Sequence, residues 1–425
     1  MIYQRFSKRQ LLAMLWWQQP RHRDRDALIC DGSIRSGKTL CMAVGFILWS
    51  MSSFTGQKFA ICGKTIQSLR RNVILNLRDW VPPALEITEY RTENKLVISN
   101  GAGRENTYFL FGGRDESSYT LIQGITLAGV LLDEVALQPR SFVEQALARC
   151  SIVGSKFWFN CNPESPVHWF YTEWVKGEQP EKHNALHLHF TMDDNWALSP
   201  AIRRRYESMY AGVFYDRYIR GLWVTAEGLI YDMFRPDIHV YKDTERPNGL
   251  PYIASRTIAC DYGTANPFVL LDIYDDGETV WVDNEYRWDS RDMETTGGRQ
   301  KTDGEYAGDF IGFMGEDPQF FCPAAVDPSA ASFITALQRR GVYVLDTDND
   351  VPNGIRRTGA LFARRSLRIH QRCKGLIEEL QSYVWDEKAA QQGVEKPVKA
   401  KDHGPDALRY YVNTCLPSYR YGEVR

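Results

Sequence analysis

Residues 30–41, CDGSIRSGKTLC, decide the fold of the first half of this chain. Gly32 is followed by four residues and then by Gly37, Lys38 and Thr39. The apolar run ALIC (27–30) precedes this segment and a helical pattern follows it, which is the context in which backbone N–H groups cradle phosphate oxygens. We therefore predict a nucleoside triphosphate site made by Gly32, Ser33, Ile34, Arg35, Ser36, Gly37, Lys38 and Thr39.

The apolar run GVLLDE (129–134) supplies the second half of such a site. Lys38 is expected to reach the β- and γ-phosphates, while Thr39 and Asp133 hold the Mg²⁺ that accompanies them. Glu134 then stands beside the metal residue, where a carboxylate can act as general base on the attacking water. An acidic residue in this place suits ATP hydrolysis better than GTPase chemistry, so we predict ATP and Mg²⁺ as cofactors.

Two weaker candidates extend the nucleotide site. Gln10 lies upstream of the loop and could contact the adenine, or it could be an ordinary helix residue. Asn160 or Asn162 follows the apolar run SKFWF (155–159) and could sense the γ-phosphate, or could form a turn before Pro163. The sequence leaves both alternatives open.

Short apolar runs alternate with helical patterns through the first 170 residues, which favours a mainly parallel sheet flanked by helices. Residues 171–230 change to a helical and polar character. A new pattern begins near 253 and gives a strand, two strands joined by Asp-Asp-Gly, a strand with a following helix, and VYVLDT (342–347) as another strand. Residues 355–382 are predicted to be helical, and 383–402 to form a protruding hairpin.

Acidic residues end several of these later elements. Asp261 and Asp327 each follow a strand, and His403 and Asp406 lie three residues apart around a helix start. Each acid alone could be a cap or turn residue. Their order matches a ribonuclease H-like nuclease, whose acids line neighbouring strand ends. Oxygen ligands of this kind suit two Mg²⁺ or Mn²⁺ ions that clamp a phosphodiester.

The net charge of −2 is low for a protein that coats nucleic acid, so DNA contacts must come from local patches. Residues 351–374 form one such patch, with six Arg, one Lys and no acid. Nine cysteines without a Cys-x-x-Cys pair indicate reduced thiols rather than zinc ligands. The longest apolar run, 41–54, is too short to span a bilayer, so no membrane role is expected.

The chain resembles the large terminase subunit of tailed bacteriophages over essentially its whole length. The resemblance rests on the following segments: GSIRSGKT, GVLLDE, FNCNPESPVHWFY, FTMDDN, GLWVTAEGLIY, ACDYGTANP, AAVDP and DHGPDALRYY. It implies a P-loop ATPase core at 1–174, a lid and linker at 175–231 and a ribonuclease H-like nuclease at 232–425. It also implies that the Asn160–Asn162 region couples hydrolysis to movement, and that Asp261, Asp327 and Asp406 bind the nuclease metals beside His403.

The resemblance further implies ATP-driven movement of double-stranded DNA into a procapsid and metal-dependent endonuclease cutting of the DNA concatemer. The implied partners are double-stranded DNA, a small terminase subunit, the portal protein and copies of this chain in a ring. The expected location is the cytoplasm of the bacterial host, not the mature virion. The alternatives are a DNA helicase or repair ATPase, and a DNA-binding scaffold with a relic P-loop.

Overall fold

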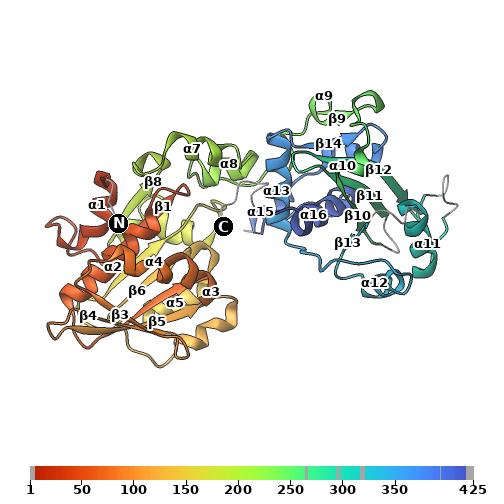
Figure 1. The fold of residues 1–425 in the computed structure, drawn as a ribbon. Coiled ribbons are helices and arrows are strands. Elements are labelled where there is room, and N and C mark those ends of the chain that lie inside the picture. The colour runs from red at the N-terminus through yellow and green to blue at the C-terminus, as the bar shows by residue number, and fades with distance from the viewer. Residues whose placement is uncertain are drawn as a thin grey trace. The chain divides into compact units, whose positions relative to one another are not determined.

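The chain forms two compact units, which are described separately (Figure 1). The first contains Met1–Arg203 and Tyr215–Thr225, and the second contains Arg204–Phe214 and Ala226–Arg425. The computed structural model describes residues 5–263, 267–292, 296, 298–315, 321–392 and 394–417. Residues 264–266 of the segment ACDYGTANP therefore lie outside the described residues. The predicted boundaries at 174/175 and 231/232 stay predictions.

The first unit is built on an eight-stranded sheet with the order β3-β4-β5-β2-β6-β7-β1-β8. Its strands are β1 (Ala27–Gly32), β2 (Lys58–Gly63), β3 (Glu86–Tyr90), β4 (Lys95–Ser99), β5 (Glu105–Gly112), β6 (Gly129–Asp133), β7 (Lys156–Asn160) and β8 (Ala185–Phe190). The six strands from β5 to β8 in this order pair in parallel, and only β3 and β4 are antiparallel. The predicted mainly parallel sheet is therefore confirmed.

Helices cover both faces of this sheet because its central strands are apolar on both sides. Phe46 and Trp49 of α2 pack against Trp158 on one face, and Phe142 of α5 belongs to the core on the other. The α-helices of the first unit are α1 (Lys8–Leu15), α2 (Lys38–Ser53), α3 (Ile66–Leu69), α4 (Leu75–Trp80), α5 (Arg140–Ala148) and α6 (Gln179–Lys182). Two further helices, α7 (Pro200–Glu207) and α8 (Gly212–Tyr218), each contain residues of both units. The shorter turns are η1 (Trp16–Gln18), η2 (Arg70–Ile74), η3 (Glu116–Ile122), η4 (Val135–Leu137), η5 (Tyr171–Val175) and η6 (Met192–Asp194).

The helical prediction for residues 171–230 is wrong for one segment. Residues 185–190, ALHLHF, form β8 and pair in parallel with the full length of β1. Apolar residues alternate with histidines along this strand, which is the two-residue period of an edge strand. The polar residues on either side hid that short alternation in the sequence.

The second unit has a six-stranded sheet with the order β13-β10-β11-β12-β14-β9. These strands are β9 (Val240–Tyr241), β10 (Ser255–Asp261), β11 (Phe268–Asp275), β12 (Val280–Trp288), β13 (Ala324–Val326) and β14 (Leu367–His370). β10, β11 and β12 are consecutive and antiparallel, and β13 joins β10 in parallel. This is the strand arrangement expected of a ribonuclease H-like domain, so the predicted fold class holds for both units.

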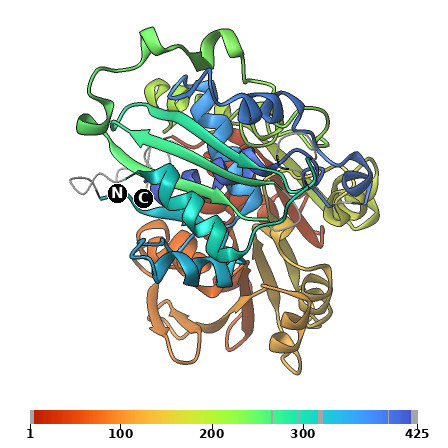
Figure 2. The same cartoon turned by 90° about the vertical axis from the view of Figure 1, so that its right-hand side faces the viewer.

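Helices lie on both faces of the second sheet (Figure 2). α11 and α12 contribute Phe310 and Phe333 to one core, while α13, α14 and α16 contribute Ile355, Leu376 and Leu408 to the other. The helices and turns are α9 (Pro236–His239), η7 (Asp243–Glu245), α10 (Leu250–Ile253), α11 (Asp303–Met314), α12 (Ala331–Gln338), α13 (Val351–Ala363), α14 (Lys374–Ser382), α15 (Glu387–Gln391) and α16 (His403–Cys415).

The predicted continuous helix at 355–382 is wrong, because β14 separates α13 from α14. Arg365 has a φ of 59°, which ends the helical path, and Leu367 and Ile369 are then buried beside β12. The predicted strand at 342–347 is reduced to one parallel bridge between Ala324 and Val344. The hairpin at 383–402 is confirmed by the antiparallel bridge of Trp385 to Pro397, although α15 lies within it.

All nine cysteines are free thiols, and six of them are buried. No helix in the described part of the chain has an apolar stretch long enough to cross a membrane.

Candidate functional site

The glycine-rich loop joins β1 to α2 with its backbone in the left-handed region at three residues. Gly32, Arg35 and Gly37 have φ values of 123°, 55° and 87°. A Cβ on Gly32 would lie 1.9 Å from the Phe190 carbonyl oxygen, so only glycine fits there. The loop therefore turns tightly into the N-terminus of a sixteen-residue helix, which is the geometry that binds phosphate.

Lys38 folds back onto this loop. Its Nζ donates to the Gly32 carbonyl at 3.0 Å, to the Ser33 carbonyl at 2.6 Å and to Asn162 Oδ1 at 3.1 Å. Burial lowers the pKa of Lys38 to about 8, because the ammonium has lost its water. A phosphate group would supply the negative charge that this buried cation lacks.

The predicted metal residues of the nucleotide site lie together. Thr39 Oγ1 is 3.5 Å from Asp133 Oδ1, and Asn160 Nδ2 donates to both side chains. Burial and the adjacent charge of Glu134 raise the pKa of Asp133 to about 7. The hydroxyl and carboxylate oxygens are ligands that Mg²⁺ prefers, so these residues fit the ion.

Glu134 sits in a backbone conformation that is rare outside glycine, with φ 55° and ψ 48°. Burial raises the pKa of its carboxyl above the ordinary range. Strained backbone and a raised pKa concentrate at functional positions, and a carboxylate of this kind is a better proton acceptor. The geometry therefore suits the predicted role as general base.

Gln10 and Asn162 both contact the loop. Gln10 is buried, and its Nε2 donates to the Ser36 carbonyl at 3.1 Å. The same amide fills the space beside Gly37 where a Cβ would stand. Gln10 thus supports the loop from α1, while its predicted contact with adenine stays a prediction. Asn162 reaches the site through Lys38, as described above.

Sequence reasoning missed a buried carboxylate directly before the loop. Asp31 is 1% exposed, and its Oδ1 lies 2.8 Å from His187 Nε2 and 3.0 Å from His189 Nδ1. Its Oδ2 accepts a hydrogen bond from Trp223 Nε1 at 2.7 Å. An acid inside the otherwise apolar run ALICDG was the available signal, but its three donors come from segments more than 150 residues away.

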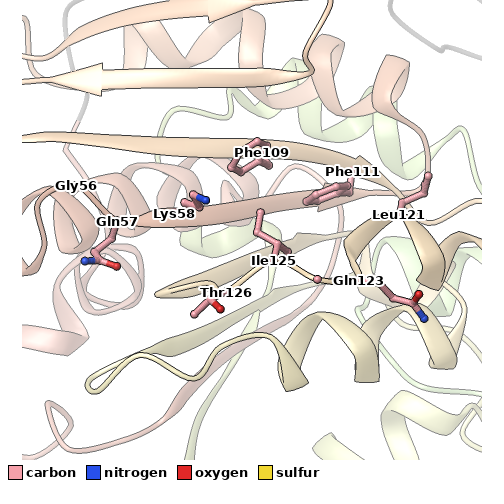
Figure 3. A pocket seen from close by; sticks show the side chains of 10 residues that line it. Gly56, Gln57, Lys58, Phe109, Phe111, Leu121, Gln123, Ile125 and Thr126 are labelled. Carbon is pink, nitrogen blue, oxygen red and sulfur yellow. The ribbon is translucent and has the colours of Figure 1, made fainter.

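A separate pocket of about 550 Å³ lies beside β2, β5 and the segment that precedes β6 (Figure 3). Phe109 and Phe111 of β5 and Lys58 of β2 line it, together with Leu121 and Ile125. None of the predicted nucleotide-binding residues borders this cavity. The nucleotide site is therefore defined by the loop and its partners, not by this pocket.

The predicted nuclease acids occupy neighbouring element ends in the second unit. Asp261 ends β10, Asp327 follows β13, and Asp406 lies in the first turn of α16. Burial raises the pKa of Asp261 to about 6, and the charges of Asp406 and Asp327 add to this rise. Three carboxylates that repel one another in this way have the donor chemistry that suits a divalent cation.

Each acid nevertheless has a protein partner. His403 Nδ1 lies 2.8 Å from Asp261 Oδ2, and the Tyr410 hydroxyl donates to Asp327 at 3.0 Å. Asp406 accepts from buried Arg409, whose Nη2 lies 3.2 Å from its Oδ1, and Lys399 Nζ lies 3.3 Å from its other oxygen. No three histidine, cysteine or acidic side chains among the described residues are placed to hold one metal ion. A metal at these acids stays a prediction that requires side-chain movement.

The basic stretch 351–374 is partly neutralised by acids from elsewhere in the second unit. Arg372 pairs with Asp243 at 2.6 Å, and Arg368 lies 3.4 Å from Glu245. The other arginines of this stretch lie on α13 and the turn that follows it, and they include Arg356, which lies over the ring of Tyr210. The net positive charge of this part of the surface is therefore smaller than the sequence of the stretch alone suggests. DNA contact by this stretch stays a prediction.

These two units define the class: a P-loop nucleotide-binding fold joined in one chain to a ribonuclease H-like fold. A family model described as the N-terminal part of the T4likevirus-type terminase large subunit matches residues 29–235. The large terminase of a thermophilic bacteriophage is 46% identical, with a TM-score of 0.87 over 96% of this chain and 99% of that one. The chain belongs to the large terminase subunit family.

Two further structures of the same thermophilic phage protein are similar to this chain. The complex with ADP is 45% identical, with a TM-score of 0.84 over 96% of this chain and 99% of that one. The complex with ATP-γ-S is also 45% identical, with a TM-score of 0.84 over 97% and 99%. No curated protein sequence matches this chain.

Proposed function

We propose that this chain hydrolyses ATP at the loop 32–39. The observation that carries the proposal is the convergence of Lys38, Thr39, Asp133 and Asn160 on one loop, with Glu134 next to them. The thermophilic phage relative has been solved with ADP and with ATP-γ-S, which supports the same ligand class here. Mg²⁺ held by Thr39 and Asp133 would neutralise phosphate charge.

Within this site each residue has a distinct task. Lys38 exchanges its loop carbonyls for phosphate oxygens, and backbone N–H groups at the start of α2 hold the remaining charge. Glu134 takes the proton of the attacking water. Asn162 now accepts from Lys38, so its partner changes when a γ-phosphate arrives. That exchange is a way for the site to distinguish ATP from ADP.

In the second unit, Asp261, Asp327 and Asp406 are the proposed ligands of two Mg²⁺ or Mn²⁺ ions. Ions held by these residues would supply Lewis-acid chemistry, both for activating a water molecule and for stabilising the leaving oxygen of a phosphodiester. His403 holds Asp261 in place through its Nδ1, and Tyr410 holds Asp327. The chain would in this way cut concatemeric DNA.

In this proposal, ATP hydrolysis drives the movement of double-stranded DNA into a procapsid. Family membership supports this output, with a small terminase subunit, a portal protein and a ring of copies as partners, in the host cytoplasm. A helicase would need a second motor domain, whereas the second sheet is ribonuclease H-like. A scaffold with a relic loop would not keep Lys38, Thr39, Asp133 and Glu134 together.

The test compares the full chain with Glu134→Gln and the control Glu144→Gln, whose carboxylate is exposed and paired with Arg140. Glu134→Gln should lower ATP turnover by roughly 10²–10⁴-fold while ADP still binds, and the control should be unchanged. Protection of DNA from nuclease, in the presence of procapsids and the small subunit, should follow ATP turnover. Unchanged hydrolysis in Glu134→Gln would refute the assignment.

A further inference from the structure

The segment Tyr215–Thr225, here called the strap, lies on the phosphate loop within the first unit. The backbone N–H of Ile34 donates to the Tyr218 carbonyl at 2.8 Å. Gly221 has a φ of 75°, and a Cβ there would stand 2.8 Å from the Ser33 nitrogen. The strap backbone therefore contacts the first half of the loop directly, with no side chain between them.

Trp223 ties the strap to the strand before the loop. Its indole N–H donates to Asp31 at 2.7 Å, and its ring packs against that of Tyr171 with the centroids 4.8 Å apart and the planes tilted by 30°. Asp31 is almost fully buried and is also bonded by two histidines of β8. A buried carboxylate shared by three donors fixes all of them, because an unpaired charge in this place would be costly.

Arg217 ties the strap to the loop that carries Asn162. Its buried guanidinium donates to the Val224 carbonyl within the strap, with Nε at 3.0 Å. Its Nη1 lies 3.5 Å from Glu164 Oε2, two residues beyond Asn162. One side chain thus holds the strap closed on itself and against the 160–164 loop.

Both anchor points of Lys38 are therefore attached to the strap. Lys38 donates to the Gly32 and Ser33 carbonyls, which belong to the part of the loop that the strap contacts. Lys38 also donates to Asn162, two residues before the Glu164 that pairs with Arg217 of the strap. A phosphate that binds Lys38 would remove its hydrogen bonds to the Gly32 and Ser33 carbonyls and to Asn162 at the same time. The strap continues at Ala226 into the second unit.

We propose that the strap senses the nucleotide, with Trp223 and Arg217 as the positioning residues that hold it on the loop and on the 160–164 turn. The inference rests on the proposed ATP site and deepens it, because it names the segment through which the state of the loop reaches the chain that enters the second unit. Neither residue contacts the nucleotide in this account.

Hydrogen–deuterium exchange of the full-length protein tests this, with and without ADP or ATP-γ-S, and with calorimetry to record nucleotide binding. In the wild type, nucleotide should change the exchange rate of strap amides. Trp223→Phe keeps the ring and removes the N–H, so strap amides should exchange roughly tenfold faster without nucleotide, and the response to nucleotide should be lost.

The matched control is Trp281→Phe in the second unit, whose indole likewise donates to a carboxylate, that of Asp276, at 2.7 Å. This variant should keep the wild-type response of the strap. Nucleotide that binds to the wild type without altering strap exchange would overturn the inference and leave the ATP site intact. No nucleotide binding at all would refute the proposed function, and the inference with it. Both of these outcomes are read from the wild-type protein with and without nucleotide, so the test remains decisive even if a variant fails to fold.

Discussion

Replacing Lys38 by Met should remove a rise in the free energy of unfolding that the wild type shows as the pH increases above about 8. Burial lowers the pKa of Lys38 from an ordinary 10.5 to about 8. The folded state therefore holds the charged ammonium at a cost of about 3 kcal/mol relative to the unfolded chain at neutral pH. Because the folded-state pKa is the lower one, this cost is present below about pH 8 and disappears as the pH rises through 8 to 10.5.

The measurement is the free energy of unfolding from urea titrations at pH 7 and pH 9.5. Relative to Lys38→Met, the wild type should gain about 2 kcal/mol between these pH values. The control Lys58→Met removes an exposed lysine of β2 and should show no such change. ADP at about 100 times its Kd should add about 2.7 kcal/mol to the wild type and nothing to Lys38→Met.

A pH-independent difference between the wild type and Lys38→Met would refute the reasoning. It would mean that the ammonium stays well solvated in the folded protein, so that bound phosphate would not be compensating a buried charge.

Three further variants test the packing around the two sites. Arg409→Met breaks the buried pair with Asp406 and should lower the free energy of unfolding by about 3 kcal/mol, whereas a loss below about 1 kcal/mol in a urea titration would contradict it. Gly221→Ala combines a left-handed φ with contact to loop backbone and should weaken ADP binding in calorimetry; unchanged affinity would argue against a tight fit. Burial raises the pKa of Asp31, but hydrogen bonds from two histidines outweigh it and leave that pKa well below its ordinary value. The stability advantage of the wild type over Asp31→Asn should therefore be complete at neutral pH and shrink below about pH 4, and an advantage that grows on acidification in a thermal melt would refute this.

The sequence predicted the parts of this molecule that depend on local pattern. The loop 32–39 needs only its glycines, a strand before it and a helix after it, and the structure has all three. Asp133 and Glu134 follow because an apolar run that ends in acids places them at a strand end. The antiparallel β11 and β12 were signalled by their turn in the same way.

Contacts between distant segments were not visible in the sequence. β8 owes its place to pairing with β1, about 160 residues earlier, and two of its own six residues are histidines. β14 interrupts an arginine-rich helical pattern because Leu367 and Ile369 fill a core position beside β12. The role of Asp31 depends on His187, His189 and Trp223, which only the folded chain brings to its carboxylate. Tertiary partners decide these features, and a single sequence does not carry them.

The proposed function places two separate hydrolytic sites in one chain, one for ATP at Glu134 and one for DNA at Asp261. The most direct measurement assays ATP turnover and plasmid cleavage with Mn²⁺, side by side, in full-length wild type, Glu134→Gln and Asp261→Asn. We expect Glu134→Gln to lose ATP turnover and keep metal-dependent cleavage, and Asp261→Asn to lose cleavage and keep ATP turnover. Cleavage that persists in Asp261→Asn, or ATP turnover that persists in Glu134→Gln, would contradict the proposed function.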